Sequence, residues 1–172
     1  MTPTDELLEM LSYMRPHKSE TEEAFIERFL RPLPGFHQDS FGNGYVRVGD
    51  EQPEILWSCH TDTVHHKEGI QEVIVIDNEA QLPVQSSSNC LGADNAVGVW
   101  IMVNMIREGV PGLYVFHRAE ELGCQGSKYV AENLKLLLDG INFAIAFDRR
   151  GTSSIITEQF CGKTASDEFA TE

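Results

Sequence analysis

Apolar residues recur along the chain with two different periods, which predicts a mixture of strands and helices. Short, nearly continuous apolar runs in "EILWSCH", "GLYVFH" and "NFAIAF" are typical of strands that are buried within a sheet. Apolar residues spaced three or four apart are typical of helices that turn one face toward a core. This second spacing predicts helices over residues 4–14, 19–30, 95–107 and 126–140.

Capping and turn residues predict where these elements begin and end. Thr4 is expected to cap the first helix, and Ser19 with Glu22 has the spacing of a capping box at the start of the second. Gly140 is expected to end the last helix. Turn residues between apolar stretches predict two hairpins and a short strand, over residues 36–49, 72–85 and 154–159.

Strands that alternate with helices favour an α/β domain, because the helices then cover both faces of the sheet. We therefore expect a three-layer α-β-α sandwich around a mixed, mainly parallel central sheet. The predicted helix over 95–107 is apolar on nearly all sides, so it is expected to pack deep against that sheet. A length of 172 residues suits one substantial core, so residues 1–172 are expected to form a single domain.

The chain is strongly acidic, with 27 Asp and Glu against 13 Lys and Arg and a formal net charge of −14 at pH 7. This charge argues against nucleic acid and against an anionic membrane as partners. The first ten residues are acidic, so we expect no secretory signal, and no apolar stretch reaches transmembrane length. The four cysteines form no CxxC motif, which predicts free thiols in a reducing cytoplasm.

Acidic or imidazole side chains follow each of the predicted buried strands, and another acid stands directly before the buried helix. Taken alone, each has an ordinary explanation, such as a solvated glutamate pair, a helix cap at Asp94, or an ion pair between Asp148 and a neighbouring arginine. In open α/β sheets, however, ligands gather at the carboxyl ends of the strands. Carboxylates crowded there repel one another unless a cation lies among them. The candidate residues are His60, Asp62, Asp94, Glu120, Glu121 and Asp148.

These side chains have the composition of a metal centre. One imidazole among several carboxylates suits zinc, cobalt or manganese better than calcium. Alternation along a strand puts His60 and Asp62 on one face, where a carboxylate can hold the imidazole in a single tautomer. Glu120 and Glu121 can divide two roles, because neighbouring side chains diverge: one can bind a metal while the other moves a proton.

The order of four segments, HTDTV, LGADNAVG, EELGCQGS and AFDRRG, resembles the di-zinc exopeptidases, a clan of aminopeptidases, carboxypeptidases and deacylases. The resemblance covers residues 55–155, and a four-part order is more specific than any single motif. It implies the fold of the zinc peptidases and two zinc ions in a complete site. It also implies that His60 and Asp148 bind one metal, that Asp94 bridges both, and that Glu121 binds the second.

The same resemblance implies roles for two further carboxylates and for one peptide bond. Asp62 would orient His60. Glu120 would be the general base that takes a proton from the attacking water and passes it to the leaving amine. The peptide bond between Asp94 and Asn95 would be cis.

One ligand of the family pattern has no counterpart in this sequence. The family has a fifth ligand, a histidine well beyond the fourth, whereas the last histidine here is His117. His65 and His66 follow the first ligand on a loop and would have to move to reach a metal. Ser166 and the acids after it have the signals of a helix start, which predicts a domain that is incomplete at its C-terminus. We therefore expect at most one firmly held metal and little or no peptidase activity.

The leading interpretation is a zinc-dependent exopeptidase, most specifically an aminopeptidase that acts on short peptides. An aspartate as the fourth ligand resembles the aminopeptidases of the clan. A carboxypeptidase or an N-acyl amino acid deacylase, which would take an acylated amino acid, is the near alternative, because one centre hydrolyses any amide that it can position. A non-catalytic relative that binds a metal or a peptide is the alternative from another class. The sequence specifies neither the side-chain preference nor the oligomeric state.

Overall fold

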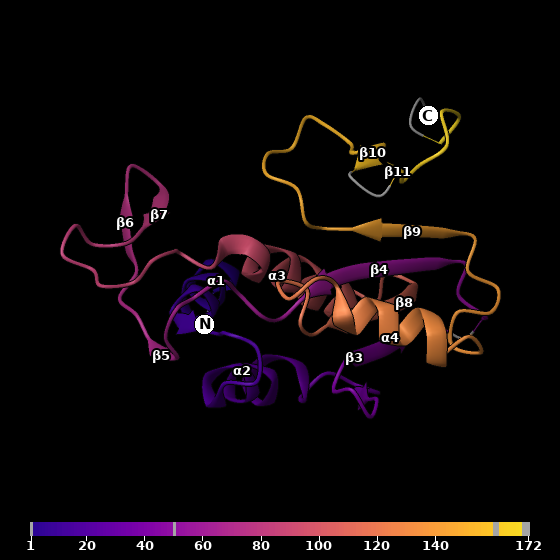
Figure 1. Ribbon diagram of the computed structural model, residues 1–172, viewed down its shortest axis with the longest axis horizontal. Helices are drawn as coiled ribbons and strands as arrows, with labels where there is room; N and C mark the ends of the chain where they lie inside the picture. The colour runs from indigo at the N-terminus through magenta and orange to yellow at the C-terminus, as the bar shows by residue number, and fades with distance from the viewer. Residues whose placement is uncertain (1, 50, 160–161, 170–172) are drawn as a thin grey trace.

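Figure 1 shows the computed structural model of the protein, which describes residues 2–49, 51–159 and 162–169. A five-stranded sheet with the strand order β2–β3–β8–β4–β9 runs through its middle. The strands are β2 (His37–Gln38), β3 (Gly44–Val48), β8 (Gly112–His117), β4 (Ile55–His60) and β9 (Phe143–Ala146).

The sheet is mixed. Its parallel half consists of β8, β4 and β9, and the candidate residues lie at the ends of these strands. β4 lies between β8 and β9 and is parallel to both, with Leu56 opposite Leu113 and Ala144. β2 and β3 form the hairpin predicted over 36–49, and β3 pairs antiparallel with β8. Parallel strands end at the same edge of a sheet, so the residues that follow β4, β8 and β9 are brought together there.

The helices build one core on each face of the sheet, because successive residues of β8 point to opposite faces. Tyr114 and Phe116 belong to the larger core, and Leu113 and Val115 belong to the smaller one. α4 covers the smaller core, and the other helices cover the larger one. The predicted α/β architecture with helices on both faces of a mixed sheet is thus confirmed. The helices are α1 (Pro3–Leu11), α2 (Glu20–Phe25) with its π-helical continuation η1 (Ile26–Leu30), α3 (Ala93–Arg107) and α4 (Gln125–Asn133).

Short antiparallel pairs lie outside the central sheet. The hairpin predicted over 72–85 is confirmed, and it turns at Asp77 and Asn78, which both have positive φ as a two-residue turn of this kind requires. Figure 1 shows this hairpin standing away from the central sheet. The described pairs are β1 (Tyr13–Met14) with β5 (Gly69–Ile70), β6 (Ile74–Ile76) with β7 (Glu79–Gln81), and β10 (Glu158–Gln159) with β11 (Gly162–Lys163).

Two helix ends differ from those predicted. The cap of α1 is Thr2 rather than Thr4: the Thr2 hydroxyl accepts from the backbone N–H of Asp5, and the Asp5 carboxylate accepts from the backbone N–H of Thr2. α4 ends at Asn133 rather than at Gly140. The turns after α4 carry further leucines into the smaller core, which explains why the apolar spacing continues past the end of the helix.

The segments after α4 are less regular and less buried than the sequence suggested. β9 was expected to be a buried strand, but it forms an edge of the sheet among the described strands, and Phe143 is 45% exposed. The strand predicted over 154–159 is reduced to the two residues of β10. Ser166 accepts from the backbone N–H of Phe169, as a helix cap would. The helix expected to follow it runs into residues 170–172, which lie outside the described part of the chain.

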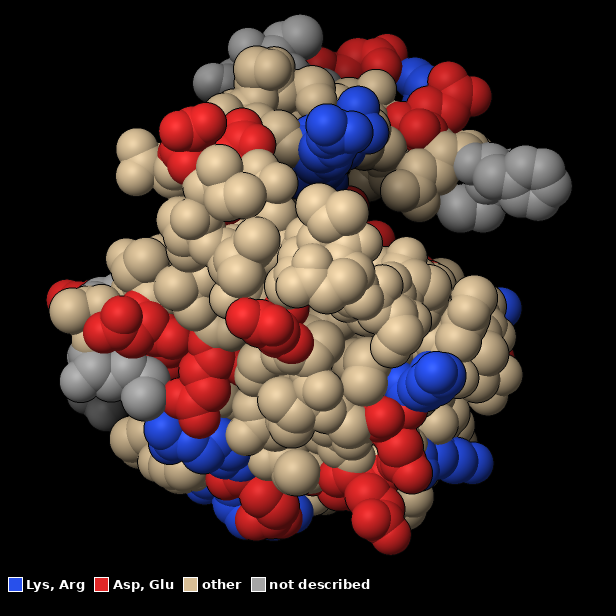
Figure 2. All heavy atoms as spheres, turned by 90° about the vertical axis from the view of Figure 1, so that its left-hand side faces the viewer, with Lys and Arg blue, Asp and Glu red and all other residues tan. Residues whose placement is uncertain are grey.

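The surface agrees with the acidic composition. Figure 2 shows acidic side chains spread over one face, with lysines and arginines between them. Cys59, Cys90 and Cys124 are free thiols. Within the described part of the chain, no helix combines the length and the apolar character needed to cross a membrane.

Met102, in the middle of α3, is fully buried in the larger core. We expect Met102→Ala to lower the free energy of unfolding by about 2–5 kcal/mol, because the lost contacts leave a cavity that the core fills only in part. Urea unfolding followed by circular dichroism measures this loss. Leu136→Ala is the control, because Leu136 is 89% exposed and its loss should change the stability little. Equal effects of the two substitutions would contradict this description of the core.

Candidate metal centre

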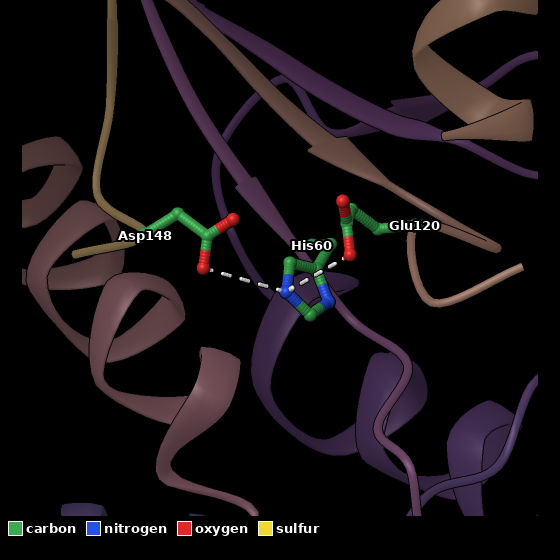
Figure 3. Close-up of side chains that lie close together, drawn as sticks. All are labelled: His60, Glu120 and Asp148. Atoms are coloured by element: carbon green, nitrogen blue, oxygen red, sulfur yellow. Dashed lines mark ion pairs between the residues drawn. The ribbon is translucent and has the colours of Figure 1, made fainter. Parts of the chain in front are cut away.

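The candidate residues meet at the carboxyl edge of the parallel half of the sheet. His60 is the last residue of β4, Asp148 follows β9, and Glu120 follows β8. Asp94 lies in the first turn of α3. Figure 3 shows the carboxylates of Glu120 and Asp148 both directed at the same ring nitrogen of His60.

Three carboxylates surround one nitrogen of His60. Its Nε2 atom lies 2.9 Å from Oδ1 of Asp94, 3.7 Å from Oδ1 of Asp148 and 3.8 Å from Oε2 of Glu120. Two overlapping groups of potential ligand atoms result, each with all its atoms within 4.8 Å of one another. One contains His60, Glu120 and Asp148, and the other contains His60, Asp94 and Glu121.

This donor set fits zinc. Zinc binds imidazole nitrogen and carboxylate oxygen at about 2.0–2.2 Å, so ligand atoms that share an ion lie within roughly 4 Å of one another. The four predicted ligands, His60, Asp94, Glu121 and Asp148, are all in the cluster. Their division between two metals stays a prediction, and so does the separate role of Glu120, which lies as near to His60 as Asp148 does.

The backbone of Asp62 fixes the orientation of the His60 ring. Nδ1 of His60 lies 2.9 Å from the backbone oxygen of Asp62, and a carbonyl only accepts hydrogen bonds, so Nδ1 carries a proton. Nε2 is thereby directed at the carboxylates. The side chain of Asp62, 3.6 Å from Nδ1, accepts the backbone N–H groups of Glu120 and Glu121 at 3.0 and 3.2 Å. Asp62 therefore positions both His60 and the glutamate pair.

The carboxylates change the proton affinity of the His60 ring and of one another. Burial alone would lower the pKa of His60, but hydrogen bonds with Asp148, Asp62 and Asp94 outweigh it and raise the pKa to about 12. The hydrogen bond with His60 lowers the pKa of Asp94. Burial and the nearby charge of Asp94 raise the pKa of Glu121. The carboxylates thus favour positive charge at the point where the donor set would hold a metal.

The start of α3 has an unusual backbone that presents Asp94 to the cluster. The peptide bond between Asp94 and Asn95 is cis, as the family resemblance implied. Both residues have non-helical backbone angles, and Gly92 before them has a φ of 74°. Because this turn departs from the helix, the Asp94 carboxylate reaches Nε2 of His60 although its side chain remains 71% exposed.

The glutamate pair lies in a turn whose contacts the sequence did not indicate. Ala119, just before it, has a φ of 54°, a left-handed conformation that turns the chain sharply after β8. Oε1 of Glu120 lies 3.2 Å from Sγ of Cys124, at the start of α4. Burial and Glu120 together raise the pKa of this thiol. The sequence did not predict that Cys124 lies beside the centre, because no spacing rule links a cysteine to a glutamate in such a turn.

His65 contacts neighbouring polar groups with both ring nitrogens. Nδ1 lies 2.6 Å from the hydroxyl of Thr63, and Nε2 lies 3.0 Å from the backbone oxygen of Cys90. Burial lowers its pKa. Within the described residues, neither ligand group contains His65 or His66.

Comparison with known proteins gives one family. Residues 44–171 match the sequence model of Peptidase family M28. No match was found among curated protein sequences.

Solved structures with this fold include several peptidases. A tripeptidase from Staphylococcus aureus superposes with a TM-score of 0.66 at 22% identity, over 87% of this chain and 43% of that one. Aminopeptidase PepT from Bacillus cereus gives 0.65 at 18% identity, over 91% and 44%. The TET1 peptidase of Pyrococcus horikoshii gives 0.56 at 14% identity, over 91% and 71%. The chain thus spans less than half the length of the first two, and these likenesses support the fold.

Gly98 sets how closely α3 approaches the segment that carries Asp148. A Cβ atom there would lie 2.4 Å from the backbone oxygen of Phe147 and 2.0 Å from Oδ1 of Asn95. Although alanine favours helices, we expect Gly98→Ala to cost about 1–3 kcal/mol of stability, because the backbone must shift. The shift would move Asp148 away from Asp94, so zinc affinity should fall as well.

Urea unfolding and zinc titration against a competing chelator measure these two effects. Val97→Ala, an exposed change on the same helix turn, is the control and should alter stability by less than about 0.5 kcal/mol. A Gly98→Ala protein that is more stable and binds zinc normally would show that the close approach is unimportant.

Proposed function

The chain belongs to peptidase family M28, and on that basis we propose that it is a zinc-dependent aminopeptidase that hydrolyses the N-terminal peptide bond of short peptides. The observation that carries the proposal is the ring of carboxylates around Nε2 of His60. Such a centre has a chemical use, because a metal held by it can activate water at neutral pH. The tripeptidase and aminopeptidase names of proteins with this fold agree with the proposal.

In this proposal His60, Asp94, Glu121 and Asp148 would hold two zinc ions, and Asp94 would contribute to both sites. Zinc, when bound, supplies a Lewis acid that polarises the scissile carbonyl and lowers the pKa of water. The backbone oxygen of Asp62 keeps the His60 ring in the tautomer that leaves Nε2 for a metal. The Asp62 carboxylate, through two backbone N–H groups, holds the turn that presents Glu120 and Glu121.

Glu120 is the proposed general base. Its carboxylate is only part-exposed and lies 3.8 Å from Nε2 of His60, beside the proposed ligand atoms. From there it can take a proton from the attacking water and deliver it to the leaving amine. A cytoplasmic location is part of the proposal, supported by the free thiols of Cys59, Cys90 and Cys124.

The ligand set predicts how much zinc the chain retains. His60, Asp94 and Asp148 give one ion three protein ligands, a set that is sufficient for a catalytic type of site. Glu121 and the shared Asp94 give the other ion two carboxylates without an imidazole. We therefore expect at most one zinc per chain after dialysis, with low activity, when zinc is measured by elemental analysis. Two tightly held zinc ions with full activity would show that the assignment of the protein ligands is wrong.

Substitution of the glutamate pair separates the proposed base from the proposed ligand. We expect Glu120→Gln to lower the turnover of aminoacyl substrates, assayed with excess zinc, by about 10²–10⁴-fold while the zinc content stays unchanged. Glu121→Gln is the matched control and should weaken the binding of the second, loosely held zinc ion, measured in the same excess of zinc. A loss of zinc on Glu120→Gln would make Glu120 a ligand, which its 3.8 Å distance from Nε2 of His60 would then explain.

A further inference from the structure

We propose that Glu22, in α2, is a positioning residue for the metal centre, and this inference rests on the proposed function. Its carboxylate ties together the two chain segments that carry His60 and Glu120. Glu22 lies outside the cluster of ligand atoms, and its spacing from Ser19 predicted only a helix cap.

The Glu22 side chain is fully buried and bonded through both oxygens. Oε1 accepts from the hydroxyl of Thr61 at 2.8 Å. Oε2 accepts from Nη2 of Arg118 at 2.5 Å and from the backbone N–H of Lys18 at 2.8 Å. The hydroxyl of Ser19 does cap α2, by accepting from the backbone N–H of Glu22 at 3.0 Å. The reciprocal half of a capping box is replaced by the bonds of Glu22 to Thr61, Arg118 and Lys18.

Thr61 directly follows His60, so contacts that fix the position of Thr61 also fix the position of the ligand. The backbone N–H of Thr61 donates to the backbone oxygen of His117 at 2.8 Å, which joins the ends of β4 and β8. Its own backbone oxygen accepts from Nε of the buried Arg15 at 2.8 Å. With Glu22 on its hydroxyl, Thr61 is held from three directions.

Arg118 is the other partner of the Glu22 carboxylate, and it lies just before the sharp turn that presents the glutamate pair. Its backbone N–H donates to Oδ1 of Asn43 at 3.0 Å, and its backbone oxygen accepts from the N–H of Gly126 at 3.0 Å. Its side chain is 7% exposed and reaches across to α2. Glu22 thereby fixes where β8 ends relative to β4.

An ion pair at this depth is poorly explained by stability alone. Removing a carboxylate and a guanidinium from water costs free energy that their attraction only partly recovers. Apolar residues of similar size in their place often make a protein equally stable. What a charged tie adds is a fixed geometry between the groups that it joins. Here those groups are Thr61, which directly follows the ligand His60, and Arg118, two residues before the base Glu120.

Glu23 provides a matched control on the same helix. Its Oε1 accepts from Nη1 of Arg118 at 2.5 Å, so it shares the arginine with Glu22. Its side chain is 50% exposed, and within the described residues its carboxylate bonds to Arg118 alone. Alanine favours helices, so alanine substitution at either position should preserve α2 itself.

The test compares Glu22→Ala with Glu23→Ala in the full chain. Zinc affinity is measured by titration against a competing chelator, at a temperature where circular dichroism shows both variants folded. We expect Glu22→Ala to weaken zinc binding by about 10–100-fold, the usual effect of losing a group that orients a ligand, and Glu23→Ala by less than about twofold. Glu22→Gln keeps the shape and one acceptor oxygen, so it should recover part of the affinity.

Thr61→Val removes the hydroxyl that donates to Glu22 and that also lies 3.3 Å from the backbone oxygen of His117. It is the test variant if Glu22→Ala does not fold. It should weaken zinc binding in a folded protein, and adding Glu22→Gln should then cost less than it does alone, because both changes break one contact. Equal zinc affinities of the Glu22 and Glu23 variants, or an unchanged affinity of Thr61→Val, would overturn the positioning role. A wild-type chain that binds zinc no better than His60→Ala would overturn the proposed function as well.

Discussion

Mutual repulsion among carboxylates at one edge of the sheet is the constraint on which the rest of this structure depends. The chain is acidic overall, yet it brings Asp94, Glu120 and Asp148 to within 4 Å of a single nitrogen of His60. Such crowding persists only where positive charge and hydrogen-bond donors compensate it. In the centre that charge belongs at Nε2 of His60, where the three carboxylates converge. Behind it, the buried guanidinium group of Arg118 offsets the charge of Glu22, and that of Arg15 donates to the backbone oxygen of Thr61.

Close backbone packing makes this concentration of charge possible. At Gly98 the helix approaches the carbonyl of Phe147 so closely that no side chain fits between them. At Gly126 the same holds for α4 and the carbonyl of Arg118, which a Cβ atom would approach to 2.3 Å. The two helices therefore clamp the chain just before Asp148 and just before Glu120. These two glycines therefore help to set the distance between Asp148 and Glu120.

The sequence predicted the sheet, its buried helix and the residues at its carboxyl edge, because apolar runs and polar strand ends are local signals. It did not predict the end of α4, where apolar spacing continues through turns past Asn133. The exposure of β9 depends on which neighbours a strand has, which no local pattern reveals. Glu22 had the spacing of a helix cap, and its partners Thr61 and Arg118 lie 39 and 96 residues away. Contacts over such separations require the fold.

β9 also bears on how the chain behaves in concentrated solution. Among the described strands β9 has a neighbour on one side only, so its other side can offer N–H and C=O groups to another chain, and the partly exposed ring of Phe143, stacked on Phe169, lies beside them. The net charge of −14 opposes such edge-to-edge pairing by repulsion between copies. Salt shortens the range of that repulsion, to about 8 Å at physiological ionic strength. Colloidal stability should therefore fall as ionic strength rises, and low-salt buffers should keep the protein dispersed.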